Sequence, residues 1–257
     1  MVGFETILCS TQTELKKLVT KGLRNIGYRP VVKPGFVYAK GKHPVLLVAH
    51  LDTVHEKTPT PDSLLYSKDG RYISSTTGVG GDDRCGVYMI MQIIKERKYH
   101  VLFCEDEETG GIGARMFAKS GIYPDVNYIV ELDRRGSNDA VFYNCSNTAF
   151  TSHVEKLGFK ESFGTFSDIS IIAPALQIAA VNISSGYFRE HTVGEYIDMD
   201  VVENNIVRVS DMCATETERF YYVSQMSRLD ELNRDIRGYI SFSEPILQTS
   251  ASLYGEC

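Results

Sequence analysis

Two histidines and several carboxylates of this chain stand where predicted strands end, and these side chains are the ones best suited to chemistry. They are His50, Asp52, Asp82, Asp83, Glu107, Glu108, Asp133 and His191. Imidazole nitrogens and carboxylate oxygens bind divalent ions such as zinc. In open α/β sheets, ligands collect beyond the carboxyl ends of the strands. The pattern therefore predicts a site for a pair of metal ions at one edge of a sheet.

His50 comes directly after the apolar run 45–49, which reads as a buried central strand that fixes the direction of the imidazole. Asp52 lies two residues further on and could accept a hydrogen bond from that imidazole. Such a bond would fix the tautomer and raise the basicity of the ligand. Read alone, this segment is more typical of a capping pair in a loop, so the metal interpretation depends on the other strand ends.

Acidic residues follow or precede three further element boundaries. Asp82 and Asp83 precede a predicted helix, where they could cap the helix or complement its dipole, or Asp82 could bridge two metals. Residues 105–108 are four consecutive acids after an apolar strand, and their mutual repulsion is unfavourable unless cations lie near. Asp133 ends another strand. His191 lies in a polar segment where a lone histidine is more often structural, so its assignment as a ligand depends on the whole set.

Strands alternate with helices along the chain, which predicts an α/β fold: a three-layer αβα sandwich around a central, mostly parallel (mixed) sheet. We expect helices at 11–26, after Gly81, at 112–119, at 149–157 and from Asp200 onward. We expect strands at 36–40, 45–49, 71–75, 101–104, 128–132, 140–144, 169–172 and 177–183, with a loop at 56–70. Thr11 with Glu14, and Asp200 with Glu203, have the spacing of capping boxes.

The bulk composition limits the classes of partner. The chain has 257 residues, 43% of them hydrophobic, and a formal net charge of −6, which suits one large α/β domain. No long basic run occurs, so we expect no nucleic-acid partner. No apolar stretch approaches the roughly 20 residues of a membrane span, and the N-terminus lacks a signal-peptide pattern, so we expect no membrane association. The six cysteines form no C-x-x-C pair, so we expect reduced thiols and a cytoplasmic location.

Five short segments carry a resemblance to a known family. They are 49–54 (AHLDTV), 81–86 (GDDRCG), 106–110 (DEETG), 131–133 (ELD) and 190–192 (EHT). In this order they resemble the co-catalytic di-zinc exopeptidases. That superfamily includes di-zinc aminopeptidases, the peptidase T and carboxypeptidase G type, and deblocking aminopeptidases. The resemblance covers the segment from about residue 40 to about residue 215.

The resemblance implies a ligand set for two metals. Asp82 would bridge both ions, with His50 and Asp133 completing one site and Glu108 and His191 completing the other. Zinc suits such a set, and cobalt or manganese would also be accepted. The family also leads us to expect a cis peptide bond between Asp82 and Asp83.

The same resemblance implies catalytic roles. Glu107 would be the general base, accepting the proton of a water held between the two metals, which then attacks as hydroxide. Asp52 would support catalysis as the hydrogen-bond partner of His50. The intervals 50–82 and 133–191 are too short for the inserted or lid domains of larger family members. We therefore expect a compact form, with one metallopeptidase-like catalytic domain at 1–220.

The residues beyond this domain, 221–257, would be a C-terminal extension of unassigned role, and an oligomer is possible. The implied function is a di-zinc metallohydrolase that cleaves an amide bond, most simply an aminopeptidase acting on peptides. The alternative is an N-acyl amino acid amidohydrolase, or deacylase, on the same scaffold. A distant alternative is a non-catalytic or nucleotide-binding α/β protein. Asp83 and Met116, however, stand where G-x-G-x-x-G would need its third glycine.

Overall fold

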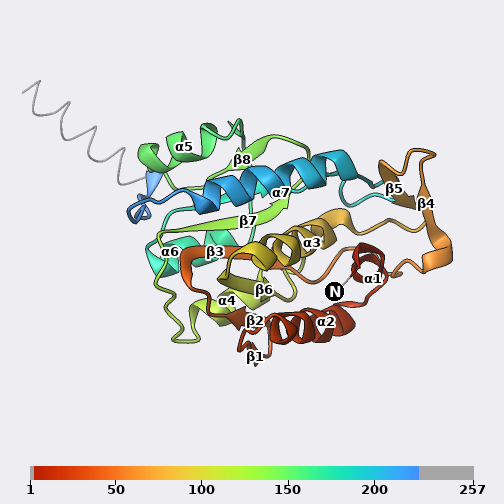
Figure 1. The fold of residues 1–257 in the computed structure, drawn as a ribbon, viewed down its shortest axis with the longest axis horizontal. Coiled ribbons are helices and arrows are strands. Elements are labelled where there is room, and N and C mark those ends of the chain that lie inside the picture. Colours follow the sequence, from red (N-terminus) through yellow and green to blue (C-terminus); the bar gives the residue numbers. More distant parts are fainter. Residues whose placement is uncertain (1–2, 226–257) are drawn as a thin grey trace, which may run out of the picture.

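In the computed structural model, which describes residues 3–225, helices cover both faces of an eight-stranded sheet (Figure 1). The helices are α1 (Phe4–Leu8), α2 (Gln12–Asn25), α3 (Gly81–Glu96), α4 (Ile112–Ala118), α5 (Thr148–Glu155), α6 (Ile169–Leu176) and α7 (Met199–Ala214), with a 3₁₀ turn at Pro61–Ser63. The sheet strands, in spatial order, are β1 (Val31–Lys33), β2 (Phe36–Ala39), β6 (Tyr99–Cys104), β3 (His43–His50), β7 (Tyr128–Arg134), β10 (Ala180–Ser184), β8 (Asp139–Val141) and β9 (Lys160–Glu161). The predicted three-layer sandwich with a mixed sheet is confirmed.

The centre of the sheet is parallel. Strand β3 pairs in parallel with both β6 and β7, and β7 pairs in parallel with β10, so the carboxyl ends of these four strands lie at one edge. Along β3, Leu47 enters the apolar core on one face and Leu46 and Val48 enter the core on the other. The predicted buried central strand is therefore confirmed, since burial on both faces produces a continuous apolar run.

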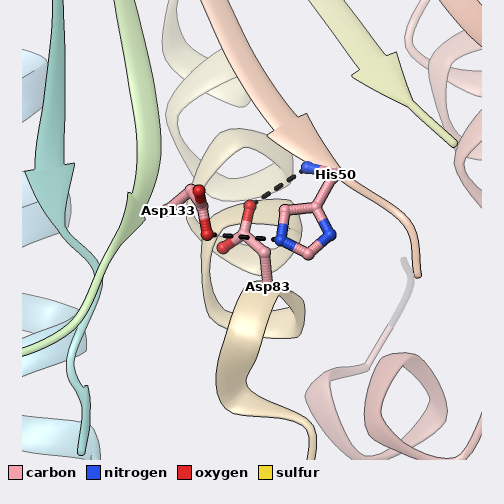
Figure 2. Close-up of side chains that lie close together, drawn as sticks. All are labelled: His50, Asp83 and Asp133. Carbon is pink, nitrogen blue, oxygen red and sulfur yellow. Dashed lines mark hydrogen bonds and ion pairs between the residues drawn. The ribbon is translucent and has the colours of Figure 1, made fainter. Parts of the chain in front are cut away.

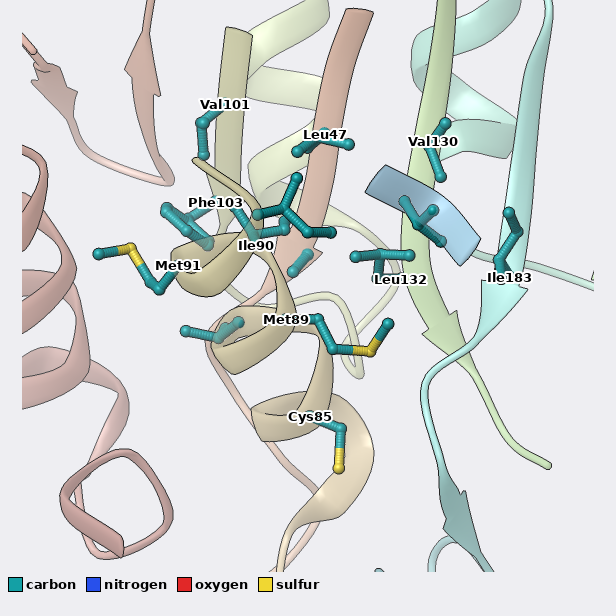
Figure 3. Packing of buried hydrophobic residues seen from close by; sticks show 14 of the residues in the cluster. Leu47, Cys85, Met89, Ile90, Met91, Val101, Phe103, Val130, Leu132 and Ile183 are labelled. Carbon is teal, nitrogen blue, oxygen red and sulfur yellow. The ribbon is translucent and has the colours of Figure 1, made fainter. Parts of the chain in front are cut away.

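Two apolar cores fix the helices on the sheet. Helices α1, α2, α3, α5 and α7 share the larger core with one face, and α4 and α6 share the smaller core with the other. Figure 3 shows Met89 and Ile90 of α3 among Leu47, Val130 and Leu132 of the central strands. Each such side chain contributes roughly 1.5–3 kcal/mol through burial, so α3 is firmly held over the strand ends.

Gly86 allows the first turn of α3 to approach β7 closely. A Cβ atom at this position would overlap the carbonyl oxygen of Leu132 and also meet the carboxylate of Asp83. No other residue type fits without displacing the helix. The close approach brings the acidic start of α3 next to the end of β7.

A second, four-stranded antiparallel sheet lies beside α3. Its strands, in spatial order, are β11 (Tyr187–Phe188), β12 (Tyr196–Asp198), β5 (Tyr72–Ser75) and β4 (Leu64–Tyr66). Strand β5 leads into the glycine-rich turn that precedes Asp82, and the loop between β11 and β12 contains His191. The small sheet therefore positions two residues that the large sheet does not carry.

The predicted strand at 169–172 is wrong, because these residues begin helix α6. The sequence Ile-Ser-Ile-Ile is rich in β-branched residues and has the composition of a buried strand. Ile169 and Ile172, however, are three residues apart and both enter the smaller core, where α4 also packs. Tertiary packing thus overrides local propensity at this place.

Two smaller expectations also differ from the structure. The predicted loop at 56–70 contains the short strand β4. Helix α7 is capped by Asp198, whose side chain accepts a hydrogen bond from the amide of Asp200 at 3.2 Å, so the proposed box of Asp200 and Glu203 is not formed. At the first long helix, the capping box of Thr11 and Glu14 is confirmed.

The described chain ends in an arm that runs along the sheet. Tyr221 forms an isolated antiparallel bridge with Ile178, and Ser224 forms one with Cys145. Most of the predicted extension at 221–257 lies outside the described residues. Within residues 3–225, no helix has both the length and the apolar character needed to cross a bilayer.

Candidate metal centre

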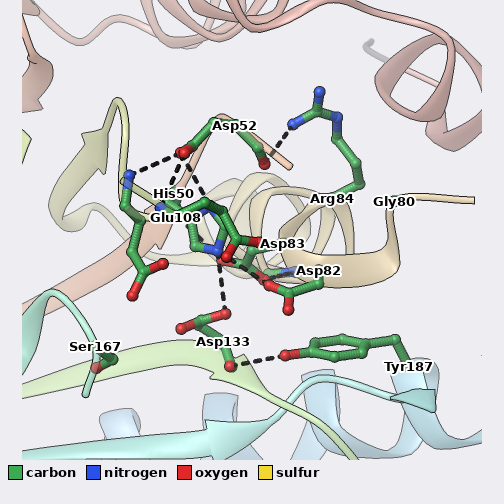
Figure 4. A network of polar contacts seen from close by, with 12 residues as sticks. His50, Asp52, Gly80, Asp82, Asp83, Arg84, Glu108, Asp133, Ser167 and Tyr187 are labelled. Carbon is green, nitrogen blue, oxygen red and sulfur yellow. Dashed lines mark hydrogen bonds and ion pairs between the residues drawn. The ribbon is translucent and has the colours of Figure 1, made fainter. Parts of the chain in front are cut away.

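The structure brings the predicted site residues together at the carboxyl edge of the large sheet. Figure 4 shows five of them: His50, Asp52, Asp82, Glu108 and Asp133. His50 is the last residue of β3, Asp133 lies near the end of β7, and Glu107 and Glu108 lie in the turn after β6. Three parallel strands therefore supply four of the residues. Asp82 at the start of α3 and His191 in the β11–β12 loop complete the cluster.

Asp82 lies between the two histidines. Its Oδ1 atom is 3.1 Å from Nε2 of His50, and its Oδ2 atom is 3.2 Å from Nε2 of His191. His50 Nε2 is also 3.3 Å from Oδ1 of Asp133, and His191 Nε2 is 3.3 Å from Oε2 of Glu108. The cluster thus consists of two groups of side chains that share one carboxylate.

The peptide bond between Asp82 and Asp83 is cis, as the family resemblance led us to expect. Asp83 lies close to His50 and Asp133, and these three side chains could geometrically surround an ion (Figure 2). Both oxygens of Asp83, however, accept backbone hydrogen bonds, from the amide of His50 at 3.1 Å and from that of Gly86 at 2.9 Å. Asp83 therefore joins the end of β3 to α3, and Asp82 is the carboxylate that remains directed at both histidines.

Asp52 connects the histidine strand to the acidic turn. Its Oδ1 atom lies 3.2 Å from Nδ1 of His50 and accepts a hydrogen bond from the amide of Glu107 at 3.0 Å. Its Oδ2 atom accepts one from the amide of Glu108 at 3.0 Å. When His50 donates from Nδ1 to Asp52, the lone pair of Nε2 faces Asp82 and Asp133. Asp52 therefore orients one histidine and two glutamates at once.

Charges in the cluster strongly perturb the histidine pKa values. Burial opposes protonation of His50, but the carboxylates of Asp133, Asp52 and Asp82 outweigh it and raise the His50 pKa well above its ordinary value. The hydrogen bond to Asp82, together with the charge of Glu108, raises the pKa of His191 to about 9. Both imidazoles thus lie in surroundings that favour a positive charge.

Glu107 combines burial with access to a cleft. Its side chain lines a cleft of about 540 Å³ together with Asp82, Glu108, Asp133 and His191. Burial, and the nearby negative charges of Glu108 and Asp82, raise the pKa of Glu107 to about 7, although His50 acts in the opposite direction. A carboxylate with this pKa can accept and release a proton near neutral pH.

The donor set fits divalent cations. Burial is the main cause that raises the pKa values of Asp133 and Glu108, and the charge of Asp82 raises them further. The Oε1 atom of Glu108 is buried and has no hydrogen-bond partner among the described residues. Buried carboxylates are stable as anions only where they are paired or coordinate a metal. These side chains therefore lie close enough together, and have the right donor atoms, for groups of them to hold a divalent ion.

Glu195 is a site residue that the sequence did not reveal. It is fully buried and accepts hydrogen bonds from the amides of Gly80 at 2.8 Å and Asp82 at 3.0 Å. It also contacts Nε2 of His55 at 2.8 Å. Its position four residues after His191 was the only available signal.

Two further side chains hold the ligands without a recognisable sequence pattern. The Tyr187 hydroxyl donates to the backbone carbonyl of Asp133 at 3.0 Å. Arg84 is buried and donates to the backbone carbonyls of Leu51 and Asp52, the latter at 3.2 Å. Both contacts involve backbone atoms, which a sequence does not specify.

Comparisons with solved structures show a common fold. Aminopeptidase PepT from Bacillus cereus ATCC 10987 is similar with a TM-score of 0.67 and 15% identity, over 82% of this chain and 96% of that one. A tripeptidase from Staphylococcus aureus gives a TM-score of 0.66 and 13% identity, over 82% of this chain and 95% of that one. The TET1 peptidase of Pyrococcus horikoshii can assemble into a tetrahedron or a large octahedral shell. It gives a TM-score of 0.58 and 15% identity, over 80% of this chain and 94% of that one.

No protein-family model matches the sequence, and no curated protein is significantly similar to it. At the low identities of the structural matches, the likeness concerns the fold alone. The similarity nevertheless extends over most of this chain and nearly all of each compared chain. The chain therefore has the fold of these aminopeptidases and peptidases, in agreement with the resemblance in its sequence.

Proposed function

We propose that this chain is a metal-dependent aminopeptidase that uses two divalent ions, with zinc as the first candidate. The single observation that carries the proposal is the position of Asp82. Its two oxygens face His50 and His191, and Asp133 and Glu108 flank these histidines. One carboxylate shared by two His-and-carboxylate groups is an arrangement that can hold two metal ions close together.

Bound divalent ions would supply Lewis-acid activation of a water molecule and of the scissile carbonyl. The chain's own residues have separate tasks. Glu107, with a pKa of about 7, accepts the proton of the attacking water and passes it to the leaving amine. Asp52 keeps Glu107 in place through its backbone amide and fixes the tautomer of His50.

The proposal also includes the setting of the enzyme. Five cysteines among the described residues are free thiols, which supports a cytoplasmic location. Assembly of several copies is part of the proposal because a protein of the same fold forms large shells. Sedimentation velocity of the full chain would measure the number of copies, and a monomer at all concentrations would contradict assembly.

The proposal is tested by metal analysis combined with a substrate panel. We expect two zinc ions per chain after dialysis, and hydrolysis of leucinamide with N-acetyl-leucinamide and N-acetyl-leucine left uncleaved. Asp82→Ala is expected to lose both ions, whereas Asp200→Ala, a matched change of an exposed aspartate, keeps them. Two ions in Asp82→Ala would refute the shared carboxylate. Cleavage of only the N-acyl substrates would favour the deacylase.

A further inference from the structure

Two phenylalanines stand at the rim of the metal cleft. Phe163 and Phe166 belong to the loop between β9 and α6, residues 162–168, and both line the cleft that contains Glu107 and His191. Phe163 is 82% exposed and Phe166 is 38% exposed. A single exposed apolar residue needs no explanation, but two on one short loop beside a polar cleft indicate a surface for an apolar group.

The loop that carries these rings is held at both ends. The amide of Ser162 donates to the carbonyl of Ala140 at 2.9 Å, which extends the pairing of β9 with β8. A Cβ atom on Gly164 would lie only 2.9 Å from Cγ1 of Val141, so a glycine lets the loop pack onto β8. The hydroxyl of Ser167 donates to the carboxylate of Glu131. The exposure of Phe163 thus occurs on an anchored loop.

Phe166 reaches the acidic turn itself. Its Cζ atom would lie 2.9 Å from a Cβ atom built on Gly111, three residues after Glu108. The ring therefore packs against the segment that carries Glu107 and Glu108. An apolar group lying on this ring would be next to the reacting centre.

The two arginines of the cleft do not offer a partner for an acidic side chain of the substrate. Arg134 pairs with Asp139 at 3.3 Å, and Arg135 pairs with Glu190. Among the described residues that line the cleft, both arginines are thus neutralised within the chain. An acidic side chain of a substrate would find a surplus of carboxylates and no unpaired arginine.

We propose that Phe163 and Phe166 form the wall that receives the side chain of the substrate's N-terminal residue, and that this side chain is large and apolar. The inference rests on the proposed function and narrows it to peptides that begin with residues such as leucine or phenylalanine. Differences of one methylene in an apolar pocket change kcat/KM by roughly 10- to 200-fold. We therefore expect leucinamide to exceed glycinamide in kcat/KM by at least about tenfold.

The first test compares side-chain preference among variants of the full, zinc-loaded chain. The substrates are the amides of leucine, phenylalanine, glycine and glutamate. Phe163→Ala is expected to lower the leucine-to-glycine ratio of kcat/KM about tenfold, and Phe163→Glu to lower it further. The matched control is Tyr123→Ala, which removes another exposed aromatic ring (75% exposed) outside the cleft. The proposed substrate-binding role of Phe163 and Phe166 would be overturned by equal kcat/KM values for all four amides in the parent. An unchanged leucine-to-glycine ratio of kcat/KM in both Phe163 variants would also overturn it.

The second test separates this inference from the proposed function. Calorimetry measures the binding of leucine hydroxamate and glycine hydroxamate to the zinc-loaded parent and to Phe163→Ala. If the parent binds leucine hydroxamate more tightly than glycine hydroxamate and Phe163→Ala abolishes this preference, the role of the two phenylalanines is supported. This holds even if no amide is cleaved and the hydrolase proposal fails. Cleavage of every amide with no leucine preference in binding would overturn the wall and leave the hydrolase intact. Absence of both binding and cleavage would overturn both.

Discussion

Glu195 fixes Asp82 through the backbone: Oε1 of the glutamate accepts the amide hydrogen of the aspartate at an N–O distance of 3.0 Å. The other oxygen, Oε2, receives the amide of Gly80 at 2.8 Å and contacts His55. Glu195 is fully buried and is not among the residues that line the cleft. The direction of the shared carboxylate therefore depends on a residue that touches neither proposed ion.

Replacing Glu195 with alanine is expected to weaken metal binding at both positions. Loss of such supporting hydrogen bonds typically costs 10–100-fold in metal affinity. The measurement is competition with a chromophoric chelator, read alongside circular dichroism to confirm the fold. Glu195→Gln, which keeps an acceptor oxygen, is expected to lie between the parent and Glu195→Ala. Glu216→Ala, at an exposed position, provides the control. Equal affinities in the parent and all three variants would contradict the role of Glu195.

Replacing Glu107 with glutamine is expected to preserve metal binding and to reduce kcat by about 10²- to 10⁴-fold, because the amide cannot accept the proton. Glu105→Gln is the matched control. Glu105 belongs to the same acidic run, but its carboxylate pairs with Lys16. Stopped assays on leucinamide and metal analysis of the same samples decide the point. A variant that turns over at the parent rate would show that another group is the base.

Gly86→Ala is expected to destabilise the fold by about 1–3 kcal/mol or more, because the added methyl group overlaps the carbonyl of Leu132. The free energy of unfolding in urea measures the effect. Gly3→Ala is the control, since a Cβ atom there meets nothing closer than 3.8 Å. If both variants unfold at the same urea concentration, α3 does not depend on this close approach.

His100 is expected to make the fold sensitive to acid. Burial, together with the charge of Lys40, lowers the pKa of His100 from 6.5 to about 4. The unfolded chain therefore takes up this proton at a higher pH than the folded chain does. The stabilising contribution is complete above about pH 6.5 and is lost as the pH falls toward 4.

The measurement for His100 is the urea midpoint at pH 7.5 and pH 5 in the presence of chelator, for the parent and for His100→Gln. Glutamine can keep a hydrogen bond to the Tyr38 hydroxyl, which lies 2.8 Å from Nδ1 of His100, but cannot titrate. We expect a smaller drop in midpoint for the variant. An identical drop in both proteins would show that other groups cause the acid sensitivity.

Much of the large sheet and its metal-competent edge could be predicted because the local signals agree with the fold. The run before His50 is apolar on both faces, as a central parallel strand requires, and the acids at 105–108 follow such a strand directly. Parallel pairing of β3, β6 and β7 then places these ends together. The order of strands along the chain was sufficient for this part of the site.

One strand of the small sheet, β5, matches the strand predicted at 71–75, but the rest of that sheet could not be read from the sequence. Strands β11 and β12 have two and three residues, too few for any alternation to be visible. Glu195 acts on Asp82 through a main-chain amide 113 residues away, and no pattern of residue types encodes such a contact. The prediction for residues 169–172 was wrong for a different reason. Their sequence favours a strand, and packing against the core makes them part of helix α6.

The candidate ligands are carried by two different sheets. His50 and Asp133 extend from the eight-stranded sheet, His191 comes from a loop of the four-stranded one, and Asp82 lies on the segment that connects them. An ion coordinated by residues from both sheets would cross-link them. Thermal unfolding would then have to break coordination bonds before the two sheets could separate. Any relative movement of the two sheets would change the distance between the imidazoles of His50 and His191.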